Sequence, residues 1–293
     1  MGSGGDPLMI LITGSGGRVG RSLEAALQRR FPDRVVAATR EELDLRDPAR
    51  LAMEMERLDP PPTVTINCAA LTDARAAESY PGEFLEVNRL GVASLARACR
   101  ELECRLIHLS SVDVFSGASL TPYREEDAPD ATSQYGRIRH LGELAAAEEN
   151  PEHLILRMSM LCGDGEEGDP LMTIRRALQE GESLPWYERR VTPLWMADFT
   201  AALQTILRSD WKGVLHLGNG GSCLLSELAG ELARYLNSPK VPELIGGDGP
   251  GSFWEGAGRN AALDTSRFSR LSGRCLRDWR QALGTTQSPE EGR

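Results

Sequence analysis

The chain has 293 residues, a hydrophobic fraction of 41% and a formal charge of −10 at pH 7. This length and apolar content suit one large α/β unit, or a nucleotide-binding domain with a smaller partner. No apolar run approaches the roughly 20 residues that cross a bilayer, and the acidic balance argues against a broad nucleic-acid-binding surface. We therefore expect neither a membrane nor a nucleic acid as a partner.

The cysteines and histidines indicate neither a disulfide framework nor a metal site. The six cysteines form no Cys-x-x-Cys pair, which favours reduced thiols and a cytoplasmic location. The four histidines are scattered, and we expect His108 and His216 to lie in strands. We predict no metal site. The N-terminus lacks the charged-then-apolar pattern of a signal peptide, and residues 1–7 read as a flexible leader.

The strongest local pattern lies close to the N-terminus. An apolar run at residues 8–12 precedes Gly14, Gly16, Gly17 and Gly20, and an amphipathic helix follows. A strand, a glycine-rich turn and a helix in this order are the context of a dinucleotide-binding motif. Gly14 would permit the turn, Gly16 and Gly17 would let the backbone approach a pyrophosphate, and Gly20 would let the helix pack on the strand. The helix N-terminus offers unpaired N–H groups to the phosphates. An ordinary glycine-rich turn is the alternative.

The rest of the first half alternates strand and helix patterns. This alternation predicts a Rossmann-type α/β fold with a doubly wound parallel sheet and connections on both faces. We expect further strands at 34–39, 63–70, 105–111 and 153–160, and helices at 48–58, 82–102 and 133–149.

Beyond residue 161 the pattern loosens, which predicts a smaller substrate-facing lobe threaded back onto the sheet at least once. We expect helices at 171–180, 193–207 and 226–236, a strand at 213–219 and a short helix near 276–283. The predicted division is a leader at 1–7, a dinucleotide-binding Rossmann domain at 8–160, a substrate-binding lobe at 161–284 and a loose tail at 285–293.

A second chemical feature is the segment YGRIRHLGE, which begins at Tyr135. Tyr135 and Arg139 are four residues apart on a predicted helix, so they share one face. A phenol with an ordinary pKa of about 10 is a weak acid–base catalyst at neutral pH, and a nearby fixed cation would favour its phenolate. Ser110 and Ser111 end the fourth strand, where a doubly wound sheet builds its site. A surface tyrosine is the alternative, but the combination favours a catalytic site.

Several segments together carry a resemblance to a known family. TGSGGRVG resembles the Thr-Gly-x-x-Gly-x-x-Gly signature of extended short-chain dehydrogenase/reductases, and the closer likeness is to the dTDP-4-dehydrorhamnose reductase branch. The likeness runs from about residue 9 to residue 283 through INCAALTDARAAE, LSSVDVFSG, PYREEDAP, YGRIRHLGE, ILRMSMLCG and LDTSRF. It implies an NAD(P)-dependent oxidoreductase that reduces a keto group on a nucleotide-linked deoxysugar.

The resemblance also assigns roles to residues. It implies that Ser111 polarises the carbonyl, that Tyr135 donates the proton, and that Arg139 takes the place of the family's lysine, which holds the nicotinamide ribose. With the glycine motif, it gives a cofactor-binding set of Gly14, Ser15, Gly16, Gly17, Arg18, Val19, Gly20, Arg40, Asp44, Leu45, Ala69, Ala70, Tyr135 and Arg139. Within this set, Asp44 and Leu45 would meet the adenine.

The form of the cofactor follows from the residues after the second strand. An acid directly after that strand would favour NAD through the ribose hydroxyls. Here Arg40 follows Thr39, and Arg18 lies in the glycine loop. Two guanidinium groups suit a 2′-phosphate, so we expect NADPH, with NAD as the alternative.

Departures from the family pattern keep other functions open. Arginine is never deprotonated, so Arg139 cannot join a proton relay as lysine can. Other departures lie where substrate would sit, at Leu71, Val112, Asp113, Met160 and Cys162. One alternative is a cofactor-binding regulatory protein with weak or no turnover, similar to the regulatory subunit of methionine adenosyltransferase. Another is a nucleotide-sugar epimerase or dehydratase that keeps its NAD redox-neutral.

Two further groups of residues have an open interpretation. Arg189 or Arg190 would meet a diphosphate in a protein that binds nucleotide sugars, or would form a surface charge run. Trp186 and Trp195 would stack on a base or pack in the core. The sequence leaves open whether the protein forms a homodimer.

Overall fold

The computed structural model describes residues 8–246 and 259–285, so the expected leader and nearly all of the expected tail lie outside the described residues. The chain divides into two compact units, each assembled from three separate segments. The first unit consists of Met1–Ser111, Gln134–Leu156 and Ile206–Val214, and the second of Val112–Ser133, Arg157–Thr205 and Leu215–Arg293.

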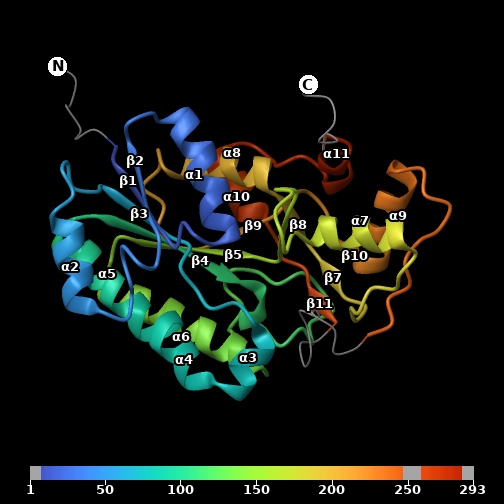
Figure 1. The fold of residues 1–293 in the computed structure, drawn as a ribbon, viewed down its shortest axis with the longest axis horizontal. Helices are drawn as coiled ribbons and strands as arrows, with labels where there is room; N and C mark the ends of the chain where they lie inside the picture. The colour runs from blue at the N-terminus through green and yellow to red at the C-terminus, as the bar shows by residue number, and fades with distance from the viewer. Residues whose placement is uncertain (1–7, 247–258, 286–293) are drawn as a thin grey trace. The chain divides into compact units, whose positions relative to one another are not determined.

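The largest sheet has six strands in the order β2-β1-β3-β4-β5-β9 (Figure 1). In chain order they are β1 (Ile10–Thr13), β2 (Val35–Ala38), β3 (Val64–Asn67), β4 (Arg105–Ser111), β5 (His153–Met158) and β9 (Gly213–Leu217). The pairs of β1 with β2, β1 with β3, and β3 with β4 are parallel. The predicted α/β fold is confirmed, and the late strand returns to the sheet beside β5 as expected.

The strand register aligns the carboxyl ends of β1, β2 and β3, and β4 extends three residues beyond them, to Ser111. Thr13 lies opposite both Ala38 and Asn67, and Asn67 lies opposite His108. β1 and β3 are buried along their whole length, as expected of parallel strands that are covered on both faces. The segments that follow these strand ends therefore emerge at one edge, where doubly wound sheets bind ligands.

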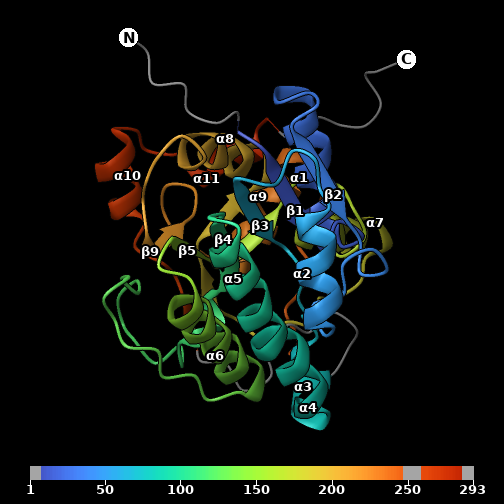
Figure 2. The same ribbon diagram turned by 90° about the vertical axis from the view of Figure 1, so that its left-hand side faces the viewer.

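Helices cover both faces of the strands in the first unit. The helical segments are α1 (Arg18–Arg30), α2 (Pro48–Glu56), α3 (Ala74–Ser79), α4 (Pro81–Leu85), the π-helical segment η1 (Glu86–Gly91), α5 (Val92–Glu101) and α6 (Gln134–Glu149). Apolar residues of α2, α5 and α6 share one core with Leu11 and Leu106, and α1 lies on the opposite face of the strands (Figures 1 and 2). The helix expected at 82–102 is the run α4–η1–α5, whereas α3 was not predicted.

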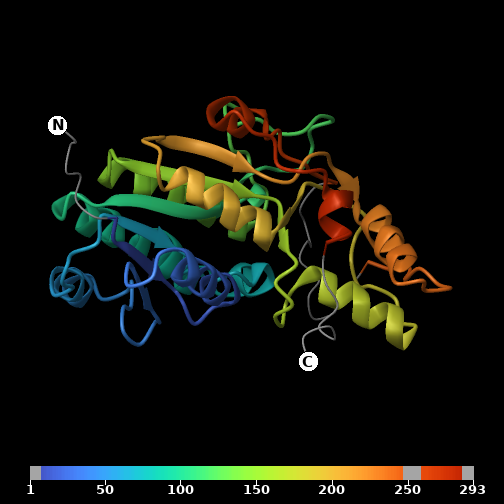
Figure 3. The ribbon, with the colours of Figure 1, turned by 90° about the horizontal axis from the view of Figure 1, so that it is seen from above.

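The second unit contains smaller sheets and the remaining helices. Its strands are β6 (Met160–Cys162), β7 (Arg190–Val191), β8 (Pro193–Trp195), β10 (Cys223–Leu224) and β11 (Asn260–Ala261), and its helices include η2 (Val112–Val114), α7 (Pro170–Glu180), α8 (Met196–Ile206), α9 (Leu225–Tyr235), α10 (Ser266–Ser272) and α11 (Trp279–Leu283). In Figure 3, α7 in yellow-green and α9 in orange lie near each other within this unit.

One predicted element of the second unit is wrong at its start. The helix expected at 193–207 begins only at Met196, because Pro193–Trp195 form the strand β8. β8 pairs in parallel with β6, and all its residues are buried. The short apolar run Pro-Leu-Trp fits a buried strand as well as a helix, and proline is tolerated as the first residue of a strand.

Candidate active site

The glycine loop between β1 and α1 has a shape that larger residues could not adopt. Gly14 has a positive φ of 69°, and a Cβ there would lie 2.6 Å from the backbone N of Ala69. A Cβ on Gly20 would lie 2.3 Å from the carbonyl oxygen of Gly14. Gly17 caps α1, and its N–H donates to Gly14 O at 3.1 Å. A Cβ on Gly16 would approach only Thr39, at 3.9 Å, so no contact within the protein requires glycine at position 16.

A cavity of about 210 Å³ opens beside this loop in the first unit. Its lining includes many of the residues predicted to bind cofactor, namely Gly14, Gly16, Gly17, Arg40, Asp44, Leu45, Ala69 and Ala70. Three further lining residues, Leu43, Cys68 and Val87, lie outside the predicted cofactor-binding set, and Leu71 was expected where substrate would sit. Ser15, Arg18, Val19 and Gly20 adjoin the loop without lining the cavity. Burial raises the pKa of the Cys68 thiol to about 12, so this thiol is uncharged at neutral pH.

Two buried asparagines hold the wall of this cavity in place. Asn67 Oδ1 accepts from Thr13 Oγ1 at 2.7 Å and from Ala69 N at 3.0 Å. Asn88 bonds both backbone groups of Leu71, accepting from its N at 2.9 Å and donating to its O at 2.8 Å. Both asparagines are buried, and buried polar groups require hydrogen-bond partners. These bonds supply such partners to the side-chain amides. Asn67 is a polar residue at the end of an apolar strand, and this pattern could have predicted its place at the site. No sequence pattern marks Asn88.

The loop after β2 carries an acidic side chain that is hydrogen-bonded within the loop and an arginine that is exposed to solvent. Glu42 accepts hydrogen bonds from the N and Oγ1 of Thr39, both at 2.8 Å, and these bonds lower its pKa. Asp44 is held chiefly by Arg46, whose hydrogen bonds lower the Asp44 pKa to about 2. The side chain of Arg40 is 64% exposed and lies 3.7 Å from Asp44. The cavity mouth therefore carries an accessible guanidinium, while Glu42 is bound to its own loop.

The two serines at the end of β4 differ in their surroundings. Ser110 is buried, and its hydroxyl donates to Glu143 Oε1 on α6 at 2.6 Å. The other carboxylate oxygen of Glu143 lies 3.4 Å from His140 Nδ1. Ser111 is only partly buried and ends the strand. Successive strand residues point to opposite faces, so the side chains of Ser110 and Ser111 lie on different faces of the sheet.

Tyr135 lies in the first turn of α6, within an apolar cluster that reaches the cavity wall. Its buried ring packs with Ala77, Phe84 and Ile138, and Leu71 packs against the same cluster. Leu71 also lines the cavity. Leu71 therefore contacts both the apolar cluster of Tyr135 and the cavity.

Arg139 is the most unusual charged residue of the site. Its side chain is 4% exposed, and Nη2 donates to the carbonyl oxygen of Leu109 on β4. Nε and Nη1 are buried and have no hydrogen-bond partner among the described residues. Buried guanidinium donors are costly unless they are paired, so these two donors are open to an acceptor that the described residues do not supply.

His108 lies between this guanidinium and the asparagine network. Its Nδ1 is 3.0 Å from Asn67 Nδ2, so Nδ1 accepts and the neutral ring carries its proton on Nε2. Burial, followed by the charge of Arg139, lowers the His108 pKa to about 3. The ring therefore stays neutral at physiological pH beside a fixed cation.

In the second unit, the expected diphosphate-binding role does not suit Arg189. Its side chain is 2% exposed, and Nη2 pairs with Asp113 Oδ1 at 3.3 Å. Burial lowers the pKa of Arg189, and Asp113 opposes that shift. Arg190 is partly buried at the start of β7. Trp186 and Trp195 are both buried in the core of this unit, which supports packing over base stacking.

Neither a metal site nor a membrane-spanning helix is found among the described residues. Within residues 8–246 and 259–285, no group of His, Cys, Asp and Glu is arranged to hold a metal ion. No helix in the part of the chain that the structure describes is long and apolar enough to span a membrane.

Comparison with known proteins places the chain in a family. The family model of the RmlD substrate binding domain matches residues 8–290. A dTDP-4-dehydrorhamnose reductase of Mycobacterium tuberculosis is 31% identical over 284 residues, covering 94% of this chain and 91% of the relative.

Solved structures share the fold. A dTDP-4-dehydrorhamnose reductase from Bacillus anthracis, in complex with NADP, superposes with a TM-score of 0.84 at 22% identity, covering 96% of this chain and 98% of that one. The Bordetella bronchiseptica enzyme WbmG, in complex with NAD and UDP, gives a TM-score of 0.79 at 17% identity over 94% and 93% of the two chains. With the family match over nearly its whole length, the chain belongs to the RmlD family, the dTDP-4-dehydrorhamnose reductase branch of the extended short-chain dehydrogenase/reductases.

Proposed function

We propose that this protein is an NADPH-dependent reductase that converts the keto group of a nucleotide-linked deoxysugar into a hydroxyl, acting as a dTDP-sugar 4-keto reductase. The observation that carries the proposal is the buried guanidinium of Arg139, whose Nε and Nη1 have no protein partner within the described residues. Its helix also carries Tyr135, whose cluster includes a residue of the cavity wall beside the glycine loop. Family membership supports the same reaction class.

The residues present fit a dinucleotide. The clashes that a Cβ would make at Gly14 and Gly20 show a loop folded tightly against the sheet and α1, which brings the N-terminus of α1 to the cavity. A helix N-terminus preceded by such a loop binds pyrophosphate through its free N–H groups. The unpaired donors of Arg139 suit the hydroxyls of the nicotinamide ribose. When bound, the nicotinamide would supply a hydride to the carbonyl carbon.

The chain's own residues would complete the reduction at the carbonyl oxygen. Ser111 would donate a hydrogen bond to that oxygen, which is the role that the family resemblance gives it, whereas Ser110 donates to Glu143. Tyr135 would give its phenolic proton to the same oxygen as the carbonyl carbon is reduced, and solvent would then return a proton to Tyr135. Arg139 would stabilise the negative charge that develops on the phenol oxygen, without exchanging a proton itself.

We further propose that the cofactor is NADPH. Arg40 is exposed and lines the cavity, which suits the 2′-phosphate of the adenosine ribose. The acid that would compete for a ribose hydroxyl, Glu42, is instead bonded to Thr39. NAD remains the alternative, and a relative in fold, WbmG, was solved with it.

The proposal extends to the substrate and the compartment. The substrate is a nucleotide sugar, and the protein works in the cytoplasm, where its six cysteines, which form no disulfide, stay reduced. A homodimer is the assembly to test by light scattering.

A second function, cofactor binding with weak or no turnover, is favoured by one observation. Arg139 is anchored to the carbonyl of Leu109, and arginine cannot relay a proton as lysine can. Under this alternative the protein would bind NADPH and a protein partner but reduce nothing. A redox-neutral epimerase or dehydratase would instead keep its cofactor bound through purification.

The deciding experiment measures NADPH oxidation by the purified protein across a panel of 4-keto-6-deoxy nucleotide sugars. We expect turnover with at least one dTDP-sugar. Tyr135→Phe should lower it by about 10²–10⁴-fold, the usual contribution of a general acid, while NADPH binding is unchanged. Tyr80→Phe, at an exposed tyrosine, is the control and should keep full activity. Binding of NADPH without reduction of any sugar would overturn the reductase and leave the regulatory alternative.

A further inference from the structure

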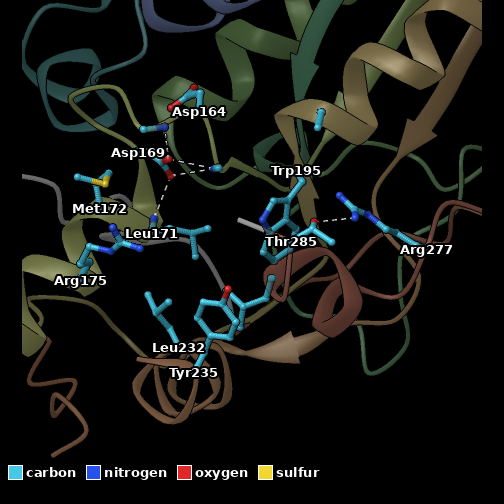
Figure 4. Close-up of a pocket in the computed structure, with 14 residues that line it drawn as sticks. Asp164, Asp169, Leu171, Met172, Arg175, Trp195, Leu232, Tyr235, Arg277 and Thr285 are labelled. Carbon is cyan, nitrogen blue, oxygen red and sulfur yellow. Dashed lines mark hydrogen bonds between the residues drawn. The ribbon is translucent and has the colours of Figure 1, made fainter. Parts of the chain in front are cut away.

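The second unit contains a cavity of about 300 Å³ that the proposed reaction does not use (Figure 4). It is lined by residues of α7, α8 and α9, by the loop after β6, and by residues around α11. We propose that it is a second ligand site, which binds a small organic carboxylate with an aromatic or branched apolar body. This inference does not depend on the reductase proposal, because no lining residue is shared with the cofactor cavity.

One arginine supplies the charge of this site. Arg175 on α7 is partly buried and lines the cavity. No hydrogen bond or ion pair engages it among the described residues, and Figure 4 shows its guanidinium extending from α7 toward other lining side chains. Arg277, the other lining arginine, is bound to Asp198 at 2.9 Å and to Thr285 at 2.7 Å. The available cation is therefore Arg175.

The acidic residues of the lining are engaged by the backbone of their own loop. Asp169 is buried and accepts from the N–H groups of Gly163, Gly165 and Leu171 at 3.0, 2.9 and 3.0 Å. Asp164 accepts from the N–H of Glu166 at 3.1 Å. These bonds stabilise the carboxylate of Asp169 and fix the conformation of the loop. This wall of the cavity is therefore already formed in the ligand-free protein.

The rest of the wall is apolar and partly uncovered. Leu232 and Leu283 face the cavity together with Trp195, against which Gly163 packs so closely that a Cβ would lie 2.6 Å from its ring. Met172 and Tyr235 also line the cavity, yet they are 39% and 44% exposed. A ligand with a ring or a branched chain would cover this apolar surface, which is a favourable transfer from water.

Charge and size together define the ligand class. A guanidinium binds a carboxylate through two parallel hydrogen bonds. One available cation suits one carboxylate, and about 300 Å³ lies at the small end of ligand pockets, which begin at roughly that volume. A dinucleotide or a nucleotide sugar is therefore too large and too highly charged for this site.

The test is calorimetric titration of the full-length protein with 3-phenylpropionate, with the uncharged 3-phenylpropanol as the matched probe. We expect the carboxylate to bind the wild-type protein at least about tenfold more tightly than the alcohol, as a charge-assisted hydrogen bond requires. Arg175→Gln should remove this preference. Arg176→Gln should keep it, because Arg176 is the adjacent residue, is exposed and pairs with Glu180 instead.

Two further measurements keep the proposal falsifiable. Ala197→Phe, at an exposed lining position on α8, should fill the cavity and abolish binding of both probes, with thermal unfolding confirming that the variant folds. Saturating NADPH should leave the affinity for 3-phenylpropionate unchanged. Competition with NADPH, equal loss in both arginine variants, no preference for the carboxylate, or no binding to the wild-type protein would each overturn the proposal.

Discussion

At the scale of single residues, Arg139 combines a cost in stability with a role in binding. Its guanidinium is buried with two unpaired donors, and a buried charge without a full set of partners destabilises the folded state. We therefore expect Arg139→Gln to raise the free energy of unfolding of the cofactor-free protein by about 1 kcal/mol. The same change should weaken NADPH binding by about tenfold. Urea unfolding and fluorescence titration measure the two effects, and a destabilised variant that still binds NADPH normally would contradict this account.

Arg40 tests the choice of cofactor. Arg40→Gln removes the exposed guanidinium at the cavity mouth, and we expect it to weaken NADPH binding by about tenfold while NADH binding changes little. Arg57→Gln is the control, because Arg57 is as exposed as Arg40, pairs with Glu54 and does not line the cavity. Titration of each variant with both cofactors gives the ratio of affinities. An equal effect on NADPH and NADH would rule out recognition of the 2′-phosphate by Arg40.

At the scale of elements, the π-helical segment η1 holds the backbone of the loop at Leu71 in place. Asn88 within it satisfies both backbone groups of Leu71, and Leu71 lines the cofactor cavity. Asn88→Ala leaves these groups without their side-chain partner, so we expect a loss of about 2–4 kcal/mol in the free energy of unfolding and weaker NADPH binding. Arg89→Ala, at the exposed neighbouring position, should change neither. Unfolding curves in urea would show the difference.

The glycine loop makes a second prediction at this scale. Gly20→Ala would place a Cβ 2.3 Å from the carbonyl oxygen of Gly14, so α1 must shift and the phosphate-binding end should lose NADPH affinity by at least about tenfold. Gly230→Ala on α9 meets no atom within 4 Å and should stabilise the protein by up to about 1 kcal/mol. Thermal unfolding and NADPH titration of the two variants test both signs. A Gly20→Ala protein that binds NADPH normally would disprove the tight packing.

At the scale of the whole molecule, the buried histidine makes stability depend on pH. The His108 pKa is about 3 in the folded protein and about 6.5 in an unfolded chain. Between these values the unfolded chain binds a proton that the folded protein excludes, so the free energy of unfolding falls as pH drops below about 6.5. The contribution of this group is about 1.4 kcal/mol per pH unit.

Replacement of His108 should flatten that dependence. His108→Gln can still accept the hydrogen bond from Asn67, and we expect its unfolding free energy to change less between pH 6.5 and 4.5 than that of the wild-type protein. His153→Gln, at a partly buried histidine on β5 outside this cluster, should keep the wild-type slope. Urea unfolding at several pH values compares the three proteins, and parallel slopes for all of them would refute the assignment.

The sequence by itself determined the features that depend on neighbouring residues. The alternation of strand and helix patterns predicted the parallel sheet. The order of strand, glycine turn and helix at residues 8–27 predicted the turn after the first strand, because the positive φ of Gly14 and the packing of Gly20 on Gly14 and Ser15 involve neighbouring residues. The spacing of Tyr135 and Arg139 on one helix likewise depends only on the helical period. The family resemblance followed from such local segments, and the match over residues 8–290 confirms it.

The tertiary structure decided which groups meet across long stretches of chain. Asp113 neutralises Arg189 from 76 residues away, and Asn88 fixes Leu71 from 17 residues away. Pro193–Trp195 became a strand because β6 lies beside it. Whether a charged side chain is exposed or buried depends on the residues that pack against it. Those residues are often distant in sequence, so the local segment does not predict them. For the same reason, only the folded protein shows that the buried guanidinium of Arg139 retains two donors without a protein partner among the described residues.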